Sequence, residues 1–251
     1  MMKALFSRLV ESSLPLRKFE VARWAGPPTL SVVADDGYLE DAADVAPLLE
    51  SFQVRGTFAI CHGLLAKPGY VDTSSVKKLI AAGHEIASHM VDHVPSTRFS
   101  NKECLHAMLE SKLRLMAMGA EVKTLVYPYG VNDRRTRKLA AQHYDQALGT
   151  WPGVTNCQFN AYAIRRMPFG SYEARRHPIS NSPEPWLDHV VQHSSLLTVM
   201  LHSGAAGRAK DHTKRLTRLL DMAKNRRIHI RTVNDALREG RAQARQTIQQ
   251  A

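Results

Sequence analysis

The segment LSVVADDGYLED, residues 30–41, joins a run of strand-forming residues to two adjacent aspartates. Asp35 and Asp36 stand where the strand pattern stops, and Gly37 after them lets the backbone turn sharply. A turn or a helix cap needs only one carboxylate, and two neighbouring carboxylates repel each other unless a cation or a proton lies between them. The segment therefore predicts either a capped turn or a cation site at the end of a strand.

Strand patterns alternate with helical patterns from this segment to the C-terminal region. Strands are expected at residues 30–34, 56–60, 85–89, 124–128, 146–150, 164–168, 196–201 and 228–233. Helices are expected at residues 38–52, 74–83, 101–119, 133–144, 184–195 and 210–227, with Asn101 as a candidate N-cap. This alternation indicates a parallel sheet covered by helices, either an open doubly wound sheet or a closed barrel.

The composition fits one folded domain. The chain has 251 residues, of which 44% are hydrophobic and 23% charged, so it can bury a large core. Charged residues interrupt each apolar run near the N-terminus before it reaches the length of a signal peptide or a membrane-spanning helix. The cysteines, Cys61, Cys104 and Cys157, are widely spaced and odd in number, which fits reduced thiols. We therefore expect a cytoplasmic protein without a transmembrane segment, although an amphipathic first turn could contact a membrane surface.

The net charge of +11 is concentrated in the last fifth of the chain. From residue 205 onward there are 12 Lys and Arg against 4 Asp and Glu, a difference of +8. An anionic partner or solvated helix faces would both explain this excess. The same segment contains no aromatic residue on which bases could stack, so we expect no nucleic-acid partner.

Two histidines follow the third predicted strand, in the segment SHMVDH of residues 88–93. A spacing of four residues on a helical turn would point the imidazoles of His89 and His93 in the same direction. With Asp36 they would form a three-ligand site that leaves coordination positions open, as catalytic zinc sites do. A second pair with this spacing, His189 and His193, lies within a predicted helix and is interpreted as surface or packing.

Two further polar segments also end predicted strands. Tyr129 lies in YPYG after the fourth strand, and His202 lies in LHSG after a late strand. The carboxyl ends of parallel strands meet at one face of the fold, so all four segments are expected to converge there.

These motifs resemble those of the polysaccharide deacetylase family, carbohydrate esterase family four, which contains the NodB homology domain. The resemblance rests on VADDG, SHMVDH, YPYG and LHSG in this order and covers about residues 28–238. It implies a deformed (β/α)7 TIM-like barrel. Outside this range we expect an N-terminal extension at residues 1–27 that packs on the barrel, and a polar basic tail at residues 239–251.

The resemblance assigns roles by position. Asp36, His89 and His93 would hold a divalent metal, most often Zn²⁺, although these ligand types also accept Co²⁺, Ni²⁺ or Fe²⁺. Asp35 would be the general base and His202 the general acid. The backbone N–H of Tyr129 would help to bind the oxyanion.

The chain departs from the family pattern in two places. The family's R-x-P-Y-G motif has an arginine beside the catalytic aspartate, whereas position 126 here is valine. One of two adjacent strand residues must face inward, so Arg165 or Arg166 could replace this arginine, and we favour Arg166. The family's fourth motif, with aspartate and tryptophan, has no clear counterpart. Candidate substrate contacts are Pro128, Tyr129, Trp151, Trp186 and Arg175. For Trp151 and Trp186 a place in the core is the favoured alternative to stacking on a sugar.

The resemblance implies a metal-dependent hydrolase that removes an N-acetyl group from an amino sugar. The substrate could be an oligosaccharide, or a sugar on a lipid or nucleotide carrier, whose negative charge would suit the basic C-terminal region. A deformylase or another small-amide hydrolase would use the same chemistry, and a non-catalytic carbohydrate-binding relative remains a second class. A non-haem iron oxygenase also uses two histidines and a carboxylate, but such sites often lie on antiparallel scaffolds.

Overall fold

The computed structural model describes residues 20–170, 179, 182–204 and 209–250. Its main sheet has eight strands, and all of their pairings are parallel. Seven of them follow the order β6-β5-β4-β3-β2-β9-β8, and β10 pairs with β2 beside this path. The bounds are β2 (Thr29–Asp36), β3 (Thr57–Ile60), β4 (Glu85–Ser88), β5 (Thr124–Val126), β6 (Gln146–Leu148), β8 (Met167–Pro168), β9 (Leu196–Leu201) and β10 (His229–Ile230).

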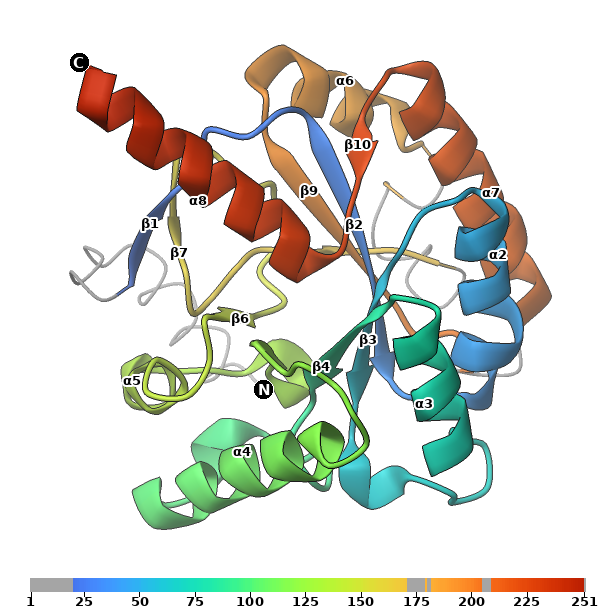
Figure 1. The fold of residues 1–251 in the computed structure, drawn as a ribbon, viewed down its shortest axis with the longest axis vertical. Helices are drawn as coiled ribbons and strands as arrows, with labels where there is room; N and C mark the ends of the chain where they lie inside the picture. Colours follow the sequence, from blue (N-terminus) through green and yellow to red (C-terminus); the bar gives the residue numbers. More distant parts are fainter. Residues whose placement is uncertain (1–19, 171–178, 180–181, 205–208, 251) are drawn as a thin grey trace.

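The sheet curls so that its two ends approach each other. Leu148, the last residue of β6, forms a parallel bridge with Ile164, which lies just before β8. Helices cover the outside of the curled sheet (Figure 1). They are α2 (Ala46–Ser51), α3 (Thr73–Ala81), α4 (Asn101–Met116), α5 (Arg134–Ala140), α6 (Glu184–His193) and α7 (Ala209–Asn225). The last helix, α8 (Val233–Gln250), instead begins at the amino ends of β3 and β4 and packs side chains against the inside of the barrel. The predicted deformed (β/α)7 barrel is confirmed.

Two layers of apolar side chains hold this arrangement. The first fills the inside of the barrel with alternate strand residues such as Val33, Ala87 and Val126, and side chains of Trp24 and α8 join it. The second, larger layer lies between the strands and the outer helices. Because side chains alternate along a strand, the positions two residues beyond Val33 and Ala87 also belong to the inward-facing series. Those positions are Asp35 and His89.

Several predicted boundaries are wrong in detail. The N-cap of α4 is Ser100, which forms a capping box with Glu103, rather than Asn101. β8 contains only residues 167–168, because the backbone of Ile164 and Arg166 bonds to the β6 segment. The sequence also gave no signal for the short antiparallel pair β1 (Val21–Arg23) and β7 (Gln158–Asn160).

The segment after β1 packs against α8 at one side of the barrel. Residues 1–19 of the predicted extension lie outside the described residues, but Trp24 packs against Gly240 of α8. A Cβ at Gly240 would lie 2.3 Å from the Trp24 ring. α8 runs unbroken through the predicted boundary at residues 238–239, so the start of the predicted tail is part of a helix.

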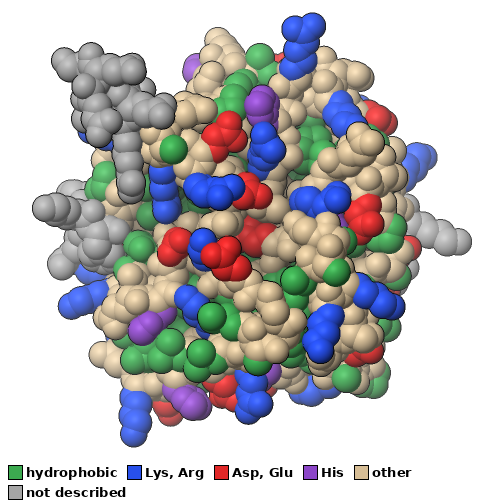
Figure 2. Space-filling model, viewed as in Figure 1, with side chains coloured by type: hydrophobic (Ala, Val, Ile, Leu, Met, Phe, Trp, Pro, Cys, Tyr) green, Lys and Arg blue, Asp and Glu red, His purple; other side chains and the backbone are tan. Residues whose placement is uncertain are grey.

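Charged side chains are spread over the visible face. Figure 2 shows Lys and Arg interspersed with Asp and Glu among the described residues there. No helix in the described part of the chain has the length and apolar character needed to cross a bilayer.

Candidate metal and catalytic site

Three potential metal ligands converge at the carboxyl end of β2. Asp36 Oδ1 lies 3.2 Å from His89 Nε2 and 3.1 Å from His93 Nε2. One ligand atom from each residue lies within 4.8 Å of the others. This is the arrangement of a carboxylate and two imidazoles around one position, which could hold a divalent cation.

The imidazoles converge for a different reason from the one predicted. Residues 89–93 form a loop after β4, not a helical turn. Positive φ angles at Met90 (62°) and His93 (48°) turn this loop back over the strand end, which brings His93 beside His89. The prediction that helical spacing orients the pair is therefore wrong, although both side chains reach Asp36.

A backbone contact fixes the proton on His89. Its Nδ1 lies 2.7 Å from the carbonyl oxygen of Val126. A carbonyl can only accept, so Nδ1 carries the proton and donates, and Nε2 presents its lone pair to Asp36. Among the described residues, His89 Nε2 and Asp36 Oδ1 are buried without a hydrogen-bond partner. Two buried acceptors that face each other fit a cation between them.

The electrostatics of Asp36 favour its ionised form. Burial raises the pKa of Asp36, but hydrogen bonds from His89 and His93 in their protonated form outweigh burial and hold the pKa well below its usual value, so positive charge at this position keeps the carboxylate ionised. The charge of His202 contributes in the same direction.

Asp35 is held by an arginine from a distant part of the chain. Arg166 Nη1 donates to both carboxylate oxygens of Asp35, at 2.8 and 2.9 Å, and Arg166 Nε donates to the Gly149 carbonyl at 2.7 Å. Asp35 is 2% exposed and Arg166 is fully buried. The guanidinium thus fixes the orientation of the carboxylate, a contact that Val126 cannot make because it contributes only an apolar side chain to the barrel interior.

His202 follows β9 at the same end of the barrel. The register pairs Leu201 with Ala34, so His202 and Asp35 are the next residues on two adjacent strands. The structure therefore brings Asp35, Asp36, His89, His93 and His202 to one mouth.

The Tyr129 turn forms another wall of this mouth. Tyr129 has φ 56° and Gly130 has φ 63°. A Cβ at Gly130 would lie 2.2 Å from Thr150 Oγ1, so only glycine fits there. Tyr129 is 58% exposed and its ring centroid lies 4.4 Å from that of His93, whereas Pro128 is buried.

Non-glycine residues with positive φ gather at this site. Of the eight such residues in the described part of the chain, four lie here, namely Asp36, Met90, His93 and Tyr129. Such conformations persist where the surrounding structure enforces them, and they are concentrated at functional sites.

Sequence reasoning missed two pairs beside the site. Tyr38 stacks on Tyr70 with ring centroids 5.3 Å apart, and burial together with the charge of Asp36 raises the pKa of Tyr38. Ser203 donates to Asp41 Oδ1 at 2.6 Å, and both residues are buried. Burial raises the pKa of Asp41 well above its usual value. Tyr38 and Asp41 lie in the opening segment, but their partners lie far along the chain.

Two of the predicted substrate contacts share one cavity, and a third lies outside the described residues. Trp151 and Trp186 line one cavity of about 610 Å³, although they come from the segment after β6 and from α6. Arg175 lies outside the described residues.

Comparison with known proteins gives a consistent family signal. A family model described as "Polysaccharide deacetylase" matches residues 24–147. A curated protein, a gellan lyase from Bacillus sp., is 27% identical over 135 residues, which are 52% of this chain and 5% of that protein. The chain thus spans only a small part of the length of that relative.

Solved structures extend the similarity over most of the chain. The Bc1960 peptidoglycan N-acetylglucosamine deacetylase has a TM-score of 0.63 and 14% identity, and the match covers 88% of this chain and 93% of that one. A chitin deacetylase from the fungus Colletotrichum lindemuthianum has a TM-score of 0.59 and 15% identity, with 86% and 89% covered. The Bacillus anthracis protein BA3943, described as a CE4 family pseudoenzyme, has a TM-score of 0.58 and 14% identity, with 85% and 66% covered. At these identities the structures establish the shared fold.

Proposed function

Because this chain belongs to the polysaccharide deacetylase family, we propose that it is a metal-dependent hydrolase that removes the N-acetyl group from an amino sugar. One observation carries the proposal. Beside a carboxylate that faces two imidazoles at 3.1–3.2 Å, a second carboxylate is held separately by a buried arginine. The two adjacent aspartates can therefore perform two different tasks.

Asp36, His89 and His93 would hold the metal, and we propose Zn²⁺ because imidazole and carboxylate are typical of catalytic zinc sites. The same donors accept Co²⁺, Ni²⁺ and Fe²⁺. A bound divalent ion supplies a Lewis acid that polarises the amide carbonyl and acidifies water.

Asp35 is our proposed general base. Its carboxylate lies at the mouth but is tied to Arg166, so its orientation stays fixed while it accepts a proton from the attacking water. Arg166 acts through Asp35 and is a positioning residue. The 2.7 Å bond from Arg166 Nε to Gly149 holds the guanidinium in turn.

The remaining roles fall to the other walls of the mouth. The Tyr129 N–H would donate to the developing oxyanion, in a turn that Gly130 and Thr150 hold in place. His202 would give a proton to the departing amine, for which an imidazole is suited near neutral pH.

A non-catalytic carbohydrate-binding function is the second candidate. The valine at position 126 and the similarity to a pseudoenzyme favour it. The contact between Arg166 and Asp35 supports the enzyme instead, because a binding protein has no need to orient a buried base. A deformylase or small-amide hydrolase would use the same residues, and the anionic carrier and cytoplasmic location stay predictions.

The test is acetate release by purified, zinc-loaded protein from N-acetylglucosamine, its dimer and its tetramer, with N-formylglucosamine in parallel. Acetate release supports the deacetylase, and release of formate alone supports a deformylase. Binding of these sugars in calorimetry without any release supports the carbohydrate-binding protein.

A further inference from the structure

The cavity of about 610 Å³ lies beside the catalytic mouth. Its walls come from the segments after β5 and β6, from β7, and from α6. This volume is within the range of about 300–1,000 Å³ found for small-molecule sites. The mechanism proposed above uses Gly130, Gly149 and Thr150 of its lining to hold other groups, but places no ligand in the cavity.

The lining combines flat apolar faces with amide groups. Trp151 and Trp186 contribute indole rings, while Asn156 and Gln158 contribute amide side chains that are exposed. A pyranose ring offers a C–H face for an aromatic ring and hydroxyl groups for hydrogen bonds, so this mixture suits a sugar.

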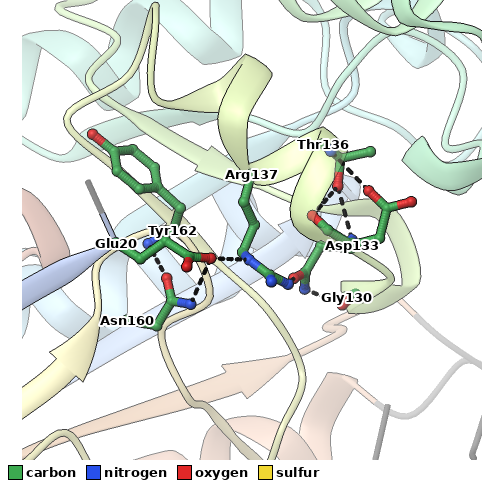
Figure 3. Close-up of polar contacts among 8 residues, drawn as sticks. Glu20, Gly130, Asp133, Thr136, Arg137, Asn160 and Tyr162 are labelled. Carbon is green, nitrogen blue, oxygen red and sulfur yellow. Dashed lines mark hydrogen bonds and ion pairs between the residues drawn. The ribbon is translucent and has the colours of Figure 1, made fainter. Parts of the chain in front are cut away.

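Arg137, which lines the cavity, belongs to a polar network with buried Glu20 (Figure 3). Arg137 Nε donates to Glu20 Oε1 at 2.5 Å, and Arg137 Nη1 donates to Asn132 Oδ1 at 3.0 Å. Asn132 Nδ2 in turn donates to the Gly130 carbonyl at 3.0 Å. The network therefore fixes this wall in place and connects it to the turn that carries Tyr129.

The charge of the lining is positive. Among the described residues that line the cavity, two are arginines and none is Asp or Glu. Glu20 pairs with Arg137, so Arg165 is the guanidinium placed to meet an anion. Its Nη1 donates to the Pro152 carbonyl at 3.2 Å, and its side chain lies over Gly153, where a Cβ would come within 3.0 Å of it. Arg165 is thus exposed to solvent, but its contacts with Pro152 and Gly153 hold its side chain against the cavity wall.

The cavity shares a wall with the reaction site. Arg166, which holds Asp35, donates from its backbone N–H to the Trp151 carbonyl and from Nε to the Gly149 carbonyl. Thr150 between them donates to the Tyr129 carbonyl at 3.3 Å. A ligand in the cavity would therefore lie next to whatever is bound at the mouth.

We propose that this cavity binds a negatively charged sugar unit of the substrate, adjacent to the unit that carries the acyl group. The proposal rests on the proposed function for the identity of the neighbouring site. It implies that the natural substrate is at least a disaccharide and carries a carboxylate or another anionic group.

The test uses two tetrasaccharides that lack an N-acyl group, so that binding is measured without turnover. Tetragalacturonic acid is the anionic probe, and cellotetraose is the neutral probe of equal length. Calorimetry at one fixed ionic strength compares the wild-type protein with Arg165→Ala, Gln158→Ala and Arg238→Ala. Arg238 is exposed on α8 and does not line the cavity, so its variant loses the same charge elsewhere.

Loss of one charge-assisted hydrogen bond corresponds to about a tenfold change in Kd. We expect tetragalacturonic acid to bind at least about tenfold more tightly than cellotetraose, and Arg165→Ala to remove this difference. Gln158→Ala should weaken both probes, and Arg238→Ala neither. Equal affinity for the two probes, no binding of either, or equal losses in Arg165→Ala and Arg238→Ala would overturn the proposal. Acetate release is assayed separately, so a deacetylase that fails to bind the anionic probe disproves this inference alone.

Discussion

Arg166 contacts both carboxylate oxygens of Asp35, although the two residues are 131 positions apart in the sequence. The guanidinium reaches Asp35 from the segment before β8, whereas the family motif would place an arginine at position 126 on β5. The arginine contact with Asp35 thus comes from the β8 end of the strand order, whereas β5 lies near the other end. The two ends are joined by the bridge between Leu148 and Ile164.

Replacing Arg166 by Lys should impair the reaction more than substrate binding. Arg166 uses two nitrogens, Nη1 for both Asp35 oxygens and Nε for the Gly149 carbonyl, and the single nitrogen of lysine cannot occupy both positions. We expect kcat to fall by about 100-fold, with little change in KM. Steady-state kinetics measure this, with Arg238→Lys as the control. A normal kcat in Arg166→Lys would show that Asp35 needs no guanidinium partner.

Removing either imidazole should abolish metal binding. His89→Ala and His93→Ala each leave two of the three ligands, whereas His106→Ala changes an exposed histidine outside the cluster. After dialysis against zinc and then buffer, we expect about one zinc per chain in the wild type and in His106→Ala. Zinc should also raise the Tm of these two proteins and not that of the two ligand variants. Equal zinc content in all four would contradict the assignment.

Asp41 should make the protein less stable as the pH rises. Burial raises the pKa of folded Asp41 above its unfolded value of 3.8, so the folded state retains a proton that the unfolded state has lost. The contribution of protonated Asp41 to the free energy of unfolding is therefore fully present below pH 3.8. It is lost as the pH rises from there toward the pKa of Asp41 in the folded state. Asp41→Asn removes this loss, so it should raise Tm more at pH 7 than at pH 4.

Asp44→Asn in the same helical turn is the control for Asp41→Asn, because Asp44 is only partly buried. Thermal unfolding at the two pH values measures both variants. A Tm increase in Asp41→Asn that is equal at pH 4 and pH 7 would rule out the proposed titration.

Gly130→Ala should displace the Tyr129 N–H. The new Cβ would lie 2.2 Å from Thr150 Oγ1, and a glycine φ of 63° adds backbone strain of about 1 kcal/mol. Gly119→Ala is the matched control, since Gly119 also has positive φ but a Cβ there meets no atom within 4 Å. We expect kcat to fall by about 100-fold in Gly130→Ala and to stay normal in Gly119→Ala. Equal activity of the two variants would argue against an oxyanion role for this turn.

The positions of the site residues could be predicted because they depend on local rules. Asp35 and Asp36 end a buried strand, and parallel strands bring such ends together. Arg166 could be favoured over Arg165 only by assuming which of the two faces inward, and the structure places Arg166 inside and Arg165 at the surface. The route of the loop from His89 to His93 could not be predicted, because it depends on positive φ angles at non-glycine residues.

The contacts that the sequence did not reveal join segments far apart. Asp41 looks like an ordinary acidic residue near a helix start until Ser203, 162 residues later, is seen to bond to it. The shared cavity of Trp151 and Trp186 has the same origin, since α6 must first pack beside the segment after β6. Such pairings follow from tertiary packing and carry no periodic signal.

Acetate release by zinc-loaded protein, compared with Asp35→Asn at equal zinc content, tests the central claim most directly. The account predicts that the wild type releases acetate from an N-acetylated amino sugar, and that Asp35→Asn keeps its zinc and its fold by circular dichroism but loses at least about 100-fold in kcat. A folded, zinc-containing Asp35→Asn protein that is as active as the wild type would contradict it, as would a wild type that releases no acetate from any such sugar.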